Sequence, residues 1–212
     1  VIFGPGSVIY GSDALGGVMD FHGLRPSLSG NNKAKVNGNA MARYMSANTE
    51  LTGHFDINIG LWKWAFLSSI SASGFDDLRM GKRNHDDYLR THYAERLDGI
   101  DKMLDNSNPR IQKFSGYDQL FLMQKIRFRP GKDYDFDYSF YYSTSSDIPR
   151  YDRLIQYDDD VLKYADWYYG PQKWMMHALT GSIFNKEGMF SSAKITLAYQ
   201  DYEESRNSRR FV

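Results

Sequence analysis

The stretch YDFDYSFYYS, Tyr134 to Ser143, decides the fold of this chain, because its residues alternate between two chemical characters. One face is aromatic throughout and carries Phe136, Tyr138, Phe140 and Tyr142. The opposite face is mostly polar and carries Asp135, Asp137, Ser139 and Tyr141. A period of two residues is typical of a β-strand whose two faces meet different surroundings. The stretch therefore predicts a two-faced strand.

The same alternation recurs in three further segments, which helical spacing fits less well. They are WKWAFLSSISASGF (62–75), LFLMQKIRFRP (120–130) and SAKITLAYQDY (192–202). Together with weaker segments, the pattern predicts about seven strands, at 33–45, 51–59, 62–75, 118–129, 134–144, 173–184 and 189–203. Aromatic residues at 16% and the absence of cysteine are typical of an extended β-protein without disulfides.

The connections between these strands are of two kinds. Tight turns are predicted at 60–63, 129–133 and 185–188, whereas long polar loops are predicted at about 76–116 and 145–172. Short turns at one end and long loops at the other are typical of an outer-membrane barrel. A soluble sandwich rarely carries loops of such length. We therefore predict an all-β fold, a partial transmembrane antiparallel β-barrel of about seven strands.

Composition and charge narrow the classes of partner. The formal net charge is +0, with 26 Lys+Arg against 26 Asp+Glu, so there is no electrostatic case for a nucleic-acid partner. The sequence has no run of about 18 apolar residues, so it predicts no membrane-spanning helix. The mean hydropathy of -0.58 still fits lipid-facing strands, because only alternate residues of such strands are apolar.

The start of the chain, GPGSVIYGSDALGGVMDF (4–21), places many glycines around a short apolar strand. No Lys-Ser/Thr pair follows the last glycine, so the stretch does not predict a nucleotide phosphate loop. It resembles the end of the plug domain of TonB-dependent outer-membrane receptors. The residues that carry the resemblance are Gly4, Pro5, Tyr10, Gly11, Gly16 and Gly17, with Ser7, Ala14 and Val18. Phe3 and the sequence MDF (19–21) depart from the family pattern.

This resemblance implies a domain organisation and a location. Residues 1–24 would form the C-terminal end of a plug domain, and residues 25–212 the N-terminal portion of the barrel, with the long loops extracellular. The protein would lie in the outer membrane of a Gram-negative bacterium, in contact with its lipid. The chain begins VIFGPG, without an initiator Met, and we expect it to be a piece of a longer protein. The segment that contacts TonB is expected upstream of Val1.

Three barrel segments resemble the iron-acquisition branch of the family. They are STSSDIPRYDRL (143–154), WYYGPQKWMMHAL (167–179) and LAYQDYEESRNSRRF (197–211). The resemblance implies active uptake of an iron-containing cargo, which could be a siderophore, haem, or a haem- or iron-carrying protein. Two alternatives remain open at this point: an adhesin that only presents binding loops, and uptake of a non-iron cargo such as an oligosaccharide or cobalamin.

Candidate contact residues lie in the longer loop, within NHDDYLRTHYAERLD (84–98). His85, Tyr88 and His92 are our candidate cargo contacts, since outward loops carry function. Their spacing matches no closed metal site, and the spacing of Leu89, Leu97 and Ile100 favours a solvated helix over 86–104. No Ser/His/acid set stands out at the outer rim, so we expect neither an enzyme nor a resident cofactor.

Overall fold

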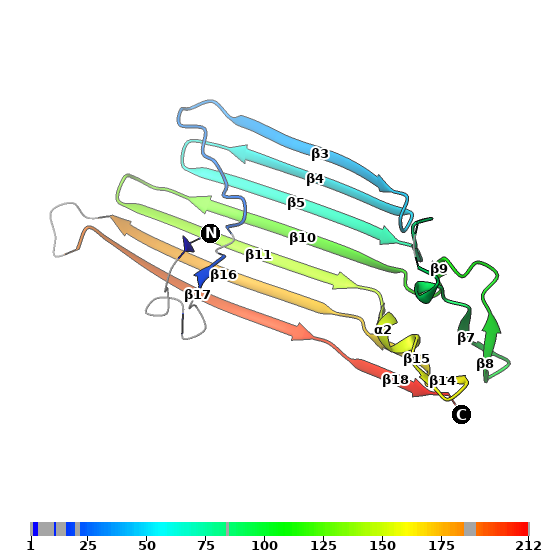
Figure 1. The fold of residues 1–212 in the computed structure, drawn as a ribbon. Helices are drawn as coiled ribbons and strands as arrows, with labels where there is room; N and C mark the ends of the chain where they lie inside the picture. The colour runs from blue at the N-terminus through cyan, green and yellow to red at the C-terminus, as the bar shows by residue number, and fades with distance from the viewer. Residues whose placement is uncertain are drawn as a thin grey trace.

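The computed structural model describes residues 2–3, 11, 16–19, 22–83, 85–184 and 190–211. Figure 1 shows one broad sheet of long strands, with short turns at its left end and extended loops at its right end. The chain is all-β, with 62% of its residues in strands and 4% in helices, which confirms the predicted class. Among the described residues, no helix is both long enough and apolar enough to cross a membrane.

The large sheet contains seven strands, and every neighbouring pair is antiparallel. Its order, β17-β16-β11-β10-β5-β4-β3, follows the chain. The strands are β3 (Lys35–Met45), β4 (Glu50–Gly60), β5 (Trp64–Phe75), β10 (Tyr117–Phe128), β11 (Tyr134–Ser145), β16 (Lys173–Phe184) and β17 (Ser192–Glu203). All seven coincide with predicted strands to within about three residues, because each long period-two pattern encodes its own strand.

The register places side chains of one kind on one face. Phe136 lies opposite Phe128, and Tyr138 lies opposite both Ile126 and Leu179. We call this side the apolar face; its exposed members include Val36, Tyr44, Leu51, Phe55, Ile59, Trp64, Ile70, Leu179, Ile195, Leu197 and Tyr199. The other side, the polar face, carries Glu50, Thr52, Asp56, Asn58, Lys125, Arg127, Asp135 and Asp137. The predicted two-faced character is thus clear on β4 and on β11, whereas on β16 Trp174 and Met176 lie on the polar face and His177 lies on the apolar face.

Burial on these two faces is the reverse of that in a water-soluble sheet. The contrast is clearest on β4, where Leu51 and Phe55 of the apolar face are 66% and 48% exposed and Glu50 and Asp56 of the polar face are 3% and 6% exposed. Both faces of the outer strands β3 and β17 are largely exposed. In a soluble antiparallel sheet the apolar face packs on the core and the polar face meets water. Here the chain itself covers polar side chains and leaves large apolar ones uncovered.

The segment 22–30 covers part of the polar face, crossing the sheet in Figure 1. Lys125 Nζ donates to the carbonyl oxygen of Leu24 at 2.7 Å, and Arg127 Nη1 donates to that of Pro26 at 3.2 Å. The backbone N–H of Ser27 donates to Asn58 Oδ1 at 2.9 Å, and Asn58 Nδ2 donates back to the Ser27 carbonyl at 3.0 Å. The segment is therefore held by side chains of several strands.

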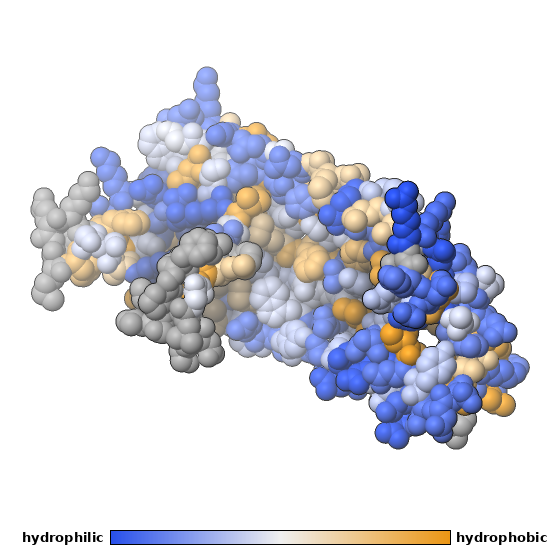
Figure 2. Space-filling model, viewed as in Figure 1, coloured by the Kyte–Doolittle hydropathy of each residue, from blue (hydrophilic) through white to orange (hydrophobic). Residues whose placement is uncertain are grey.

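Small sheets and two short helices fill the long connections. In the first long connection, β6 (Leu78–Arg79) pairs with β9 (Ile111–Gln112), and β7 (His92–Leu97) pairs with β8 (Ile100–Asp105). In the second, β13 (Tyr157–Asp158) pairs with β14 (Val161–Leu162). The strand β15 (Tyr164–Tyr169) pairs with both β12 (Ile148–Pro149) and β18 (Arg206–Arg210). The helices are η1 (Asp86–Tyr88) and α2 (Tyr151–Leu154). Figure 2 shows hydrophilic residues concentrated over this loop end of the molecule.

The helix predicted over 86–104 is wrong, because most of this stretch forms the hairpin β7–β8. Asp98 and Gly99 make its turn, with φ angles of 51° and 80°. A two-residue turn with both φ angles positive matches the twist of a hairpin, and Asp-Gly is among its strongest sequence signals. The turn chemistry therefore outweighs the helical spacing of the three apolar residues.

Part of the plug-like stretch can be compared with its predicted role. Gly4, Pro5 and Tyr10 lie outside the described residues, as does the predicted turn at 185–188. Near the start, β1 (Ile2–Phe3) pairs antiparallel with β2 (Gly17–Val18). Gly11 has a φ of +101°, which favours glycine, but no described atom lies within 4 Å of a Cβ built on it. Its backbone conformation is sufficient to account for glycine there.

Candidate functional site

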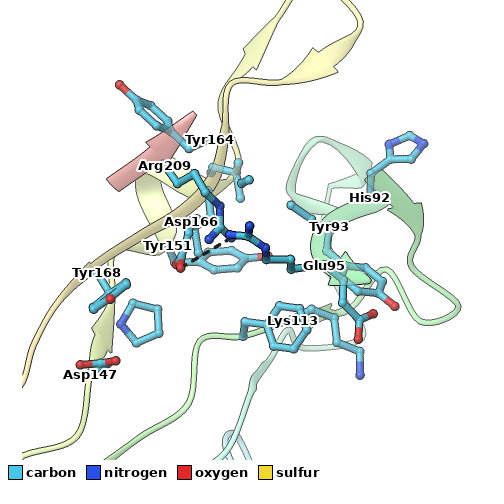
Figure 3. Close-up of a pocket in the computed structure, with 17 residues that line it drawn as sticks. His92, Tyr93, Glu95, Lys113, Asp147, Tyr151, Tyr164, Asp166, Tyr168 and Arg209 are labelled. Carbon is cyan, nitrogen blue, oxygen red and sulfur yellow. Dashed lines mark ion pairs between the residues drawn. The ribbon is translucent and has the colours of Figure 1, made fainter. Parts of the chain in front are cut away.

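A cavity of about 370 Å³, here called the loop cavity, lies between the two long connections. Its walls come from β7, from residues 147–155, from β15 and from Arg209 on β18 (Figure 3). Five aromatic side chains line it: Tyr93, Phe114, Tyr151, Tyr164 and Tyr168. Aromatic side chains beside polar and charged groups in a concave site are suited to a small polar ligand.

Arg209 is held between carboxylates at one side of the loop cavity. Its Nε donates to Asp101 Oδ2 at 2.8 Å, and its Nη2 lies 3.9 Å from Asp166 Oδ2, the pair dashed in Figure 3. Burial raises the pKa of Asp166, an effect that Arg209 opposes. Burial also raises the pKa of Tyr151 to about 12. Near neutral pH the Tyr151 hydroxyl is therefore protonated and can donate a hydrogen bond into the cavity.

Four further charged residues line the loop cavity without an ion pair to any described residue. They are Glu95 and Arg96 on β7, Lys113 in the segment after β9, and Asp147 in the segment before β12. Glu95 and Arg96 lie directly across the hairpin from Lys102 and Asp101, whereas Lys113 is outside any strand pair, which leaves Lys113 the more available to an anionic ligand. The cavity thus combines aromatic surface with charges of both signs.

The alternation of β15 explains how this strand serves the cavity. Asp166 and Tyr168 line the cavity, whereas Trp167 and Tyr169 lie on the other face of the strand. The pairing is irregular between Tyr164 and Asp166, and there both Tyr164 and Ala165 line the cavity. Two guanidinium groups stack on that other face. Arg150 lies 5.1 Å from the ring centroid of Trp167, and Arg206 lies 5.3 Å from that of Tyr169. These cation–π contacts fix the strand that presents the cavity wall.

Of the three predicted contact residues, the structure brings only His92 to the loop cavity. Its Nδ1 lies 3.1 Å from the Tyr157 hydroxyl, and its Nε2 lies 3.4 Å from Asp105 Oδ1. His85 precedes η1 and Tyr88 ends it; both are exposed and neither lines this cavity. In the described part of the chain, no group of three or more His, Asp or Glu side chains could hold a metal ion.

A cluster of four charges ties the segment 22–30 to the polar face. Arg127 donates to both oxygens of Asp135, from Nε at 2.9 Å and from Nη2 at 2.6 Å. Arg25 Nη2 donates to Asp135 Oδ2 at 3.1 Å and to Asp137 Oδ2 at 2.6 Å. The hydrogen bond to Asp137 raises the pKa of Arg25, so this guanidinium is charged throughout the accessible pH range.

Most residues of the loop cavity were not among the sequence predictions. The Asp98-Gly99 pair could have predicted the hairpin that carries Tyr93 and Glu95. Arg209 reaches the cavity only because β18 pairs with β15, about 40 residues earlier in the chain, and no local pattern specifies such a pairing.

Comparisons of this chain with protein-family models, with curated proteins and with solved structures found no match. The structural features of the chain that bear on its function are the uncovered apolar face of the sheet and the loop cavity.

Proposed function

We propose that this chain is the first part of the barrel wall of a TonB-dependent outer-membrane receptor, preceded by the end of its plug, and that the receptor takes up an iron-containing cargo. The observation that carries the proposal is the inverted burial of the sheet. Large apolar side chains that no described residue covers suit the acyl chains of lipid, and a polar face suits the lumen of a barrel.

The dimensions of the strands agree with a membrane location. The strands contain 11 or 12 residues, and tilted strands of about 9 to 11 residues cross the hydrocarbon core. Aromatic rings form a ladder near the short turns: the ring of Trp64 lies 4.2 Å from that of Phe128, which lies 6.4 Å from that of Phe136. Outer-membrane barrels carry aromatic girdles at both interfaces.

The segment 22–30 has the place expected for the connection between plug and wall. It follows the plug-like stretch directly and lies on the polar face, where its Arg25 joins the charge cluster. The outer strands β3 and β17 each pair on one side only among the described residues. In the proposed barrel further strands complete these edges, since open edges do not occur in the hydrocarbon region.

The loop cavity is the proposed place of first contact with cargo, at the extracellular end of the wall. The resemblance of 143–154, 167–179 and 197–211 to iron-acquisition receptors supports an iron-containing cargo. TonB would act through a segment upstream of Val1. Uptake of this kind transports the cargo without converting it, so the proposed role requires no catalysis.

A second candidate is uptake of a non-iron organic cargo, such as an oligosaccharide. The observation that favours it is the aromatic wall of the loop cavity, together with the lack of a cluster of metal ligands among the described residues. Aromatic walls with a few polar groups suit organic ligands in general. The two candidates differ in the nutrient whose use depends on the protein.

Growth on defined nutrients tests the proposal. A strain that lacks the protein should lose growth on haem or on a ferric siderophore as the only iron source, and the wild-type protein should restore it. The change Lys113→Glu should raise the cargo concentration needed for growth about tenfold, equivalent to about 1.4 kcal/mol of binding free energy. The reason is that haem propionates and many ferric siderophores are anionic.

Lys82→Glu is the matched control, because Lys82 is an exposed residue of the same loop and does not line the cavity. It should leave the growth curve unchanged. Normal growth of the deletion strain on every iron source, with loss of growth on an oligosaccharide alone, would contradict the iron assignment and support the second candidate.

A further inference from the structure

Ser71, His54 and Asp56 form a hydrogen-bonded series on the polar face. Ser71 of β5 lies directly opposite His54 of β4, and Asp56 follows two residues later on the same face. His54 Nδ1 lies 2.7 Å from Ser71 Oγ, and His54 Nε2 lies 3.1 Å from Asp56 Oδ2. The order hydroxyl, imidazole, carboxylate is that of an activated serine nucleophile.

The carboxylate fixes the tautomer of the imidazole. Asp56 is 6% exposed, and both of its oxygens accept from Asn39 Nδ2 at 3.1 Å, so its position is held from the neighbouring strand. An ionised Asp56 accepts the Nε2–H of His54, which leaves the lone pair of Nδ1 to accept the Ser71 hydroxyl proton. His54 is thereby oriented as a general base for Ser71.

Ser71 also lines a cavity of about 100 Å³, formed with residues of β10, β11 and β16. Apolar and aromatic side chains form much of its wall: Phe121, Met123, Tyr141 and Trp174. Ser69, two residues earlier on the same face, lines the same cavity, and its hydroxyl has no hydrogen bond to any described residue. A serine hydroxyl in that position can donate to an oxyanion that forms on a substrate bound at Ser71.

We propose that Ser71, His54 and Asp56 are the catalytic residues of a hydrolytic site for carboxylic esters with a short acyl chain. This activity goes beyond the uptake function; it rests on the proposed barrel location and not on the identity of the cargo. The acyl chain is assigned to the small cavity beside Ser71, whose volume of about 100 Å³ has room for a few carbons. The site lies on the face proposed to line the lumen, within reach of molecules that enter from the loop end.

The reaction proceeds by two acyl transfers. Ser71 Oγ attacks the ester carbonyl carbon while His54 Nδ1 takes the hydroxyl proton, and Ser69 donates to the oxyanion. The intermediate collapses, the C–O bond to the alcohol breaks, and His54 returns the proton to the departing alkoxide. A water molecule then attacks the acyl-Ser71 ester with His54 as base, releasing the carboxylic acid and the free serine.

The neighbouring serine of the same strand provides a matched control. Ser73 lies on the same face, but its hydroxyl bonds Thr52 Oγ1 at 2.9 Å, and Thr52 donates to Glu50 at 2.6 Å. Ser73 therefore has no imidazole base. A difference in reactivity between Ser71 and Ser73 would come from His54 and not from the strand or the face.

The test uses outer membranes that contain the full-length protein and a fluorophosphonate probe, which labels activated serines covalently. We expect labelling at Ser71, identified by mass spectrometry, and its loss in Ser71→Ala. His54→Gln should slow labelling about 100-fold, the lower range for loss of a general base, and Ser73→Ala should not change it. Hydrolysis of p-nitrophenyl acetate should follow the same order, with p-nitrophenyl palmitate not hydrolysed.

Each variant is compared at equal amounts of assembled protein, measured by heat-modifiable migration on gels, so that loss of folding is not mistaken for loss of chemistry. Absence of label from assembled wild-type protein would overturn the proposal. Equal labelling of the wild-type protein and His54→Gln would also overturn it, because Ser71 would then not be activated by the imidazole.

Discussion

Leu197→Arg is expected to prevent most of the protein from assembling in the outer membrane, whereas Ala198→Arg is expected to leave assembly nearly normal. Leu197 is 67% exposed on the apolar face and lies opposite Leu179, near the middle of β17. An arginine at the bilayer midplane costs about 2 to 4 kcal/mol on the lipid face of such barrels. This is a large part of a typical folding free energy of about 5 to 15 kcal/mol.

Ala198 is the matched control because it is the next residue of the same strand and points to the polar face, opposite Ala178. An arginine there meets a polar lumen and costs little. The measurement is the fraction of each variant that shows heat-modifiable migration in isolated outer membranes. Equal loss of assembly in the two variants would contradict the assignment of the faces.

Asp135→Ala is expected to lower the free energy of unfolding by about 3 to 5 kcal/mol, the cost of removing one partner of a buried ion pair. Asp135 is 2% exposed and accepts two hydrogen bonds from Arg127, whose side chain is only 13% exposed. The change leaves this guanidinium without its carboxylate. It also removes one of the two bonds that hold Arg25.

Asp137→Ala serves as the comparison, with an expected loss below about 1 kcal/mol. Its partner Arg25 is 54% exposed, so water can solvate the guanidinium that remains. Urea unfolding of the full-length protein in lipid bilayers, followed by tryptophan fluorescence, gives both values. Equal destabilisation by the two changes would show that Arg127 and Asp135 are not a buried structural pair.

The large sheet could be predicted from the sequence because the residues that specify each strand lie within that strand and the turns beside it. Each strand carries its own alternation, as in Tyr134–Ser145, and the short turns at 61–63 and 129–133 leave neighbouring strands little freedom of register. The stretch 86–104 was predicted wrongly, because the helical spacing of its apolar residues was given more weight than the Asp98-Gly99 turn.

The sites could be predicted much less well, because they depend on pairing between distant segments. Of the predicted contact residues, only His92 lines the loop cavity. Arg209, which was not predicted, lines it because β18 pairs with β15. The contact between His54 and Ser71 requires the register of β4 against β5, which places two residues 17 positions apart directly opposite each other. Neither residue carries a sequence motif that indicates its partner.

The proposed membrane location requires the apolar face of the sheet to contact lipid. Nitroxide spin labels placed one at a time at positions 193 to 199, in the protein in lipid bilayers, measure this contact directly. Oxygen enters lipid and relaxes labels that face it, whereas a water-soluble nickel chelate relaxes labels that face water. We predict that the accessibility of the labels to oxygen alternates with a period of two residues. Labels at Ile195, Leu197 and Tyr199 should be accessible to oxygen and not to nickel. Labels at Lys194, Thr196 and Ala198 should show much less contact with oxygen. Nickel access to Ile195, Leu197 and Tyr199, or no alternation along the strand, would contradict a lipid-facing wall.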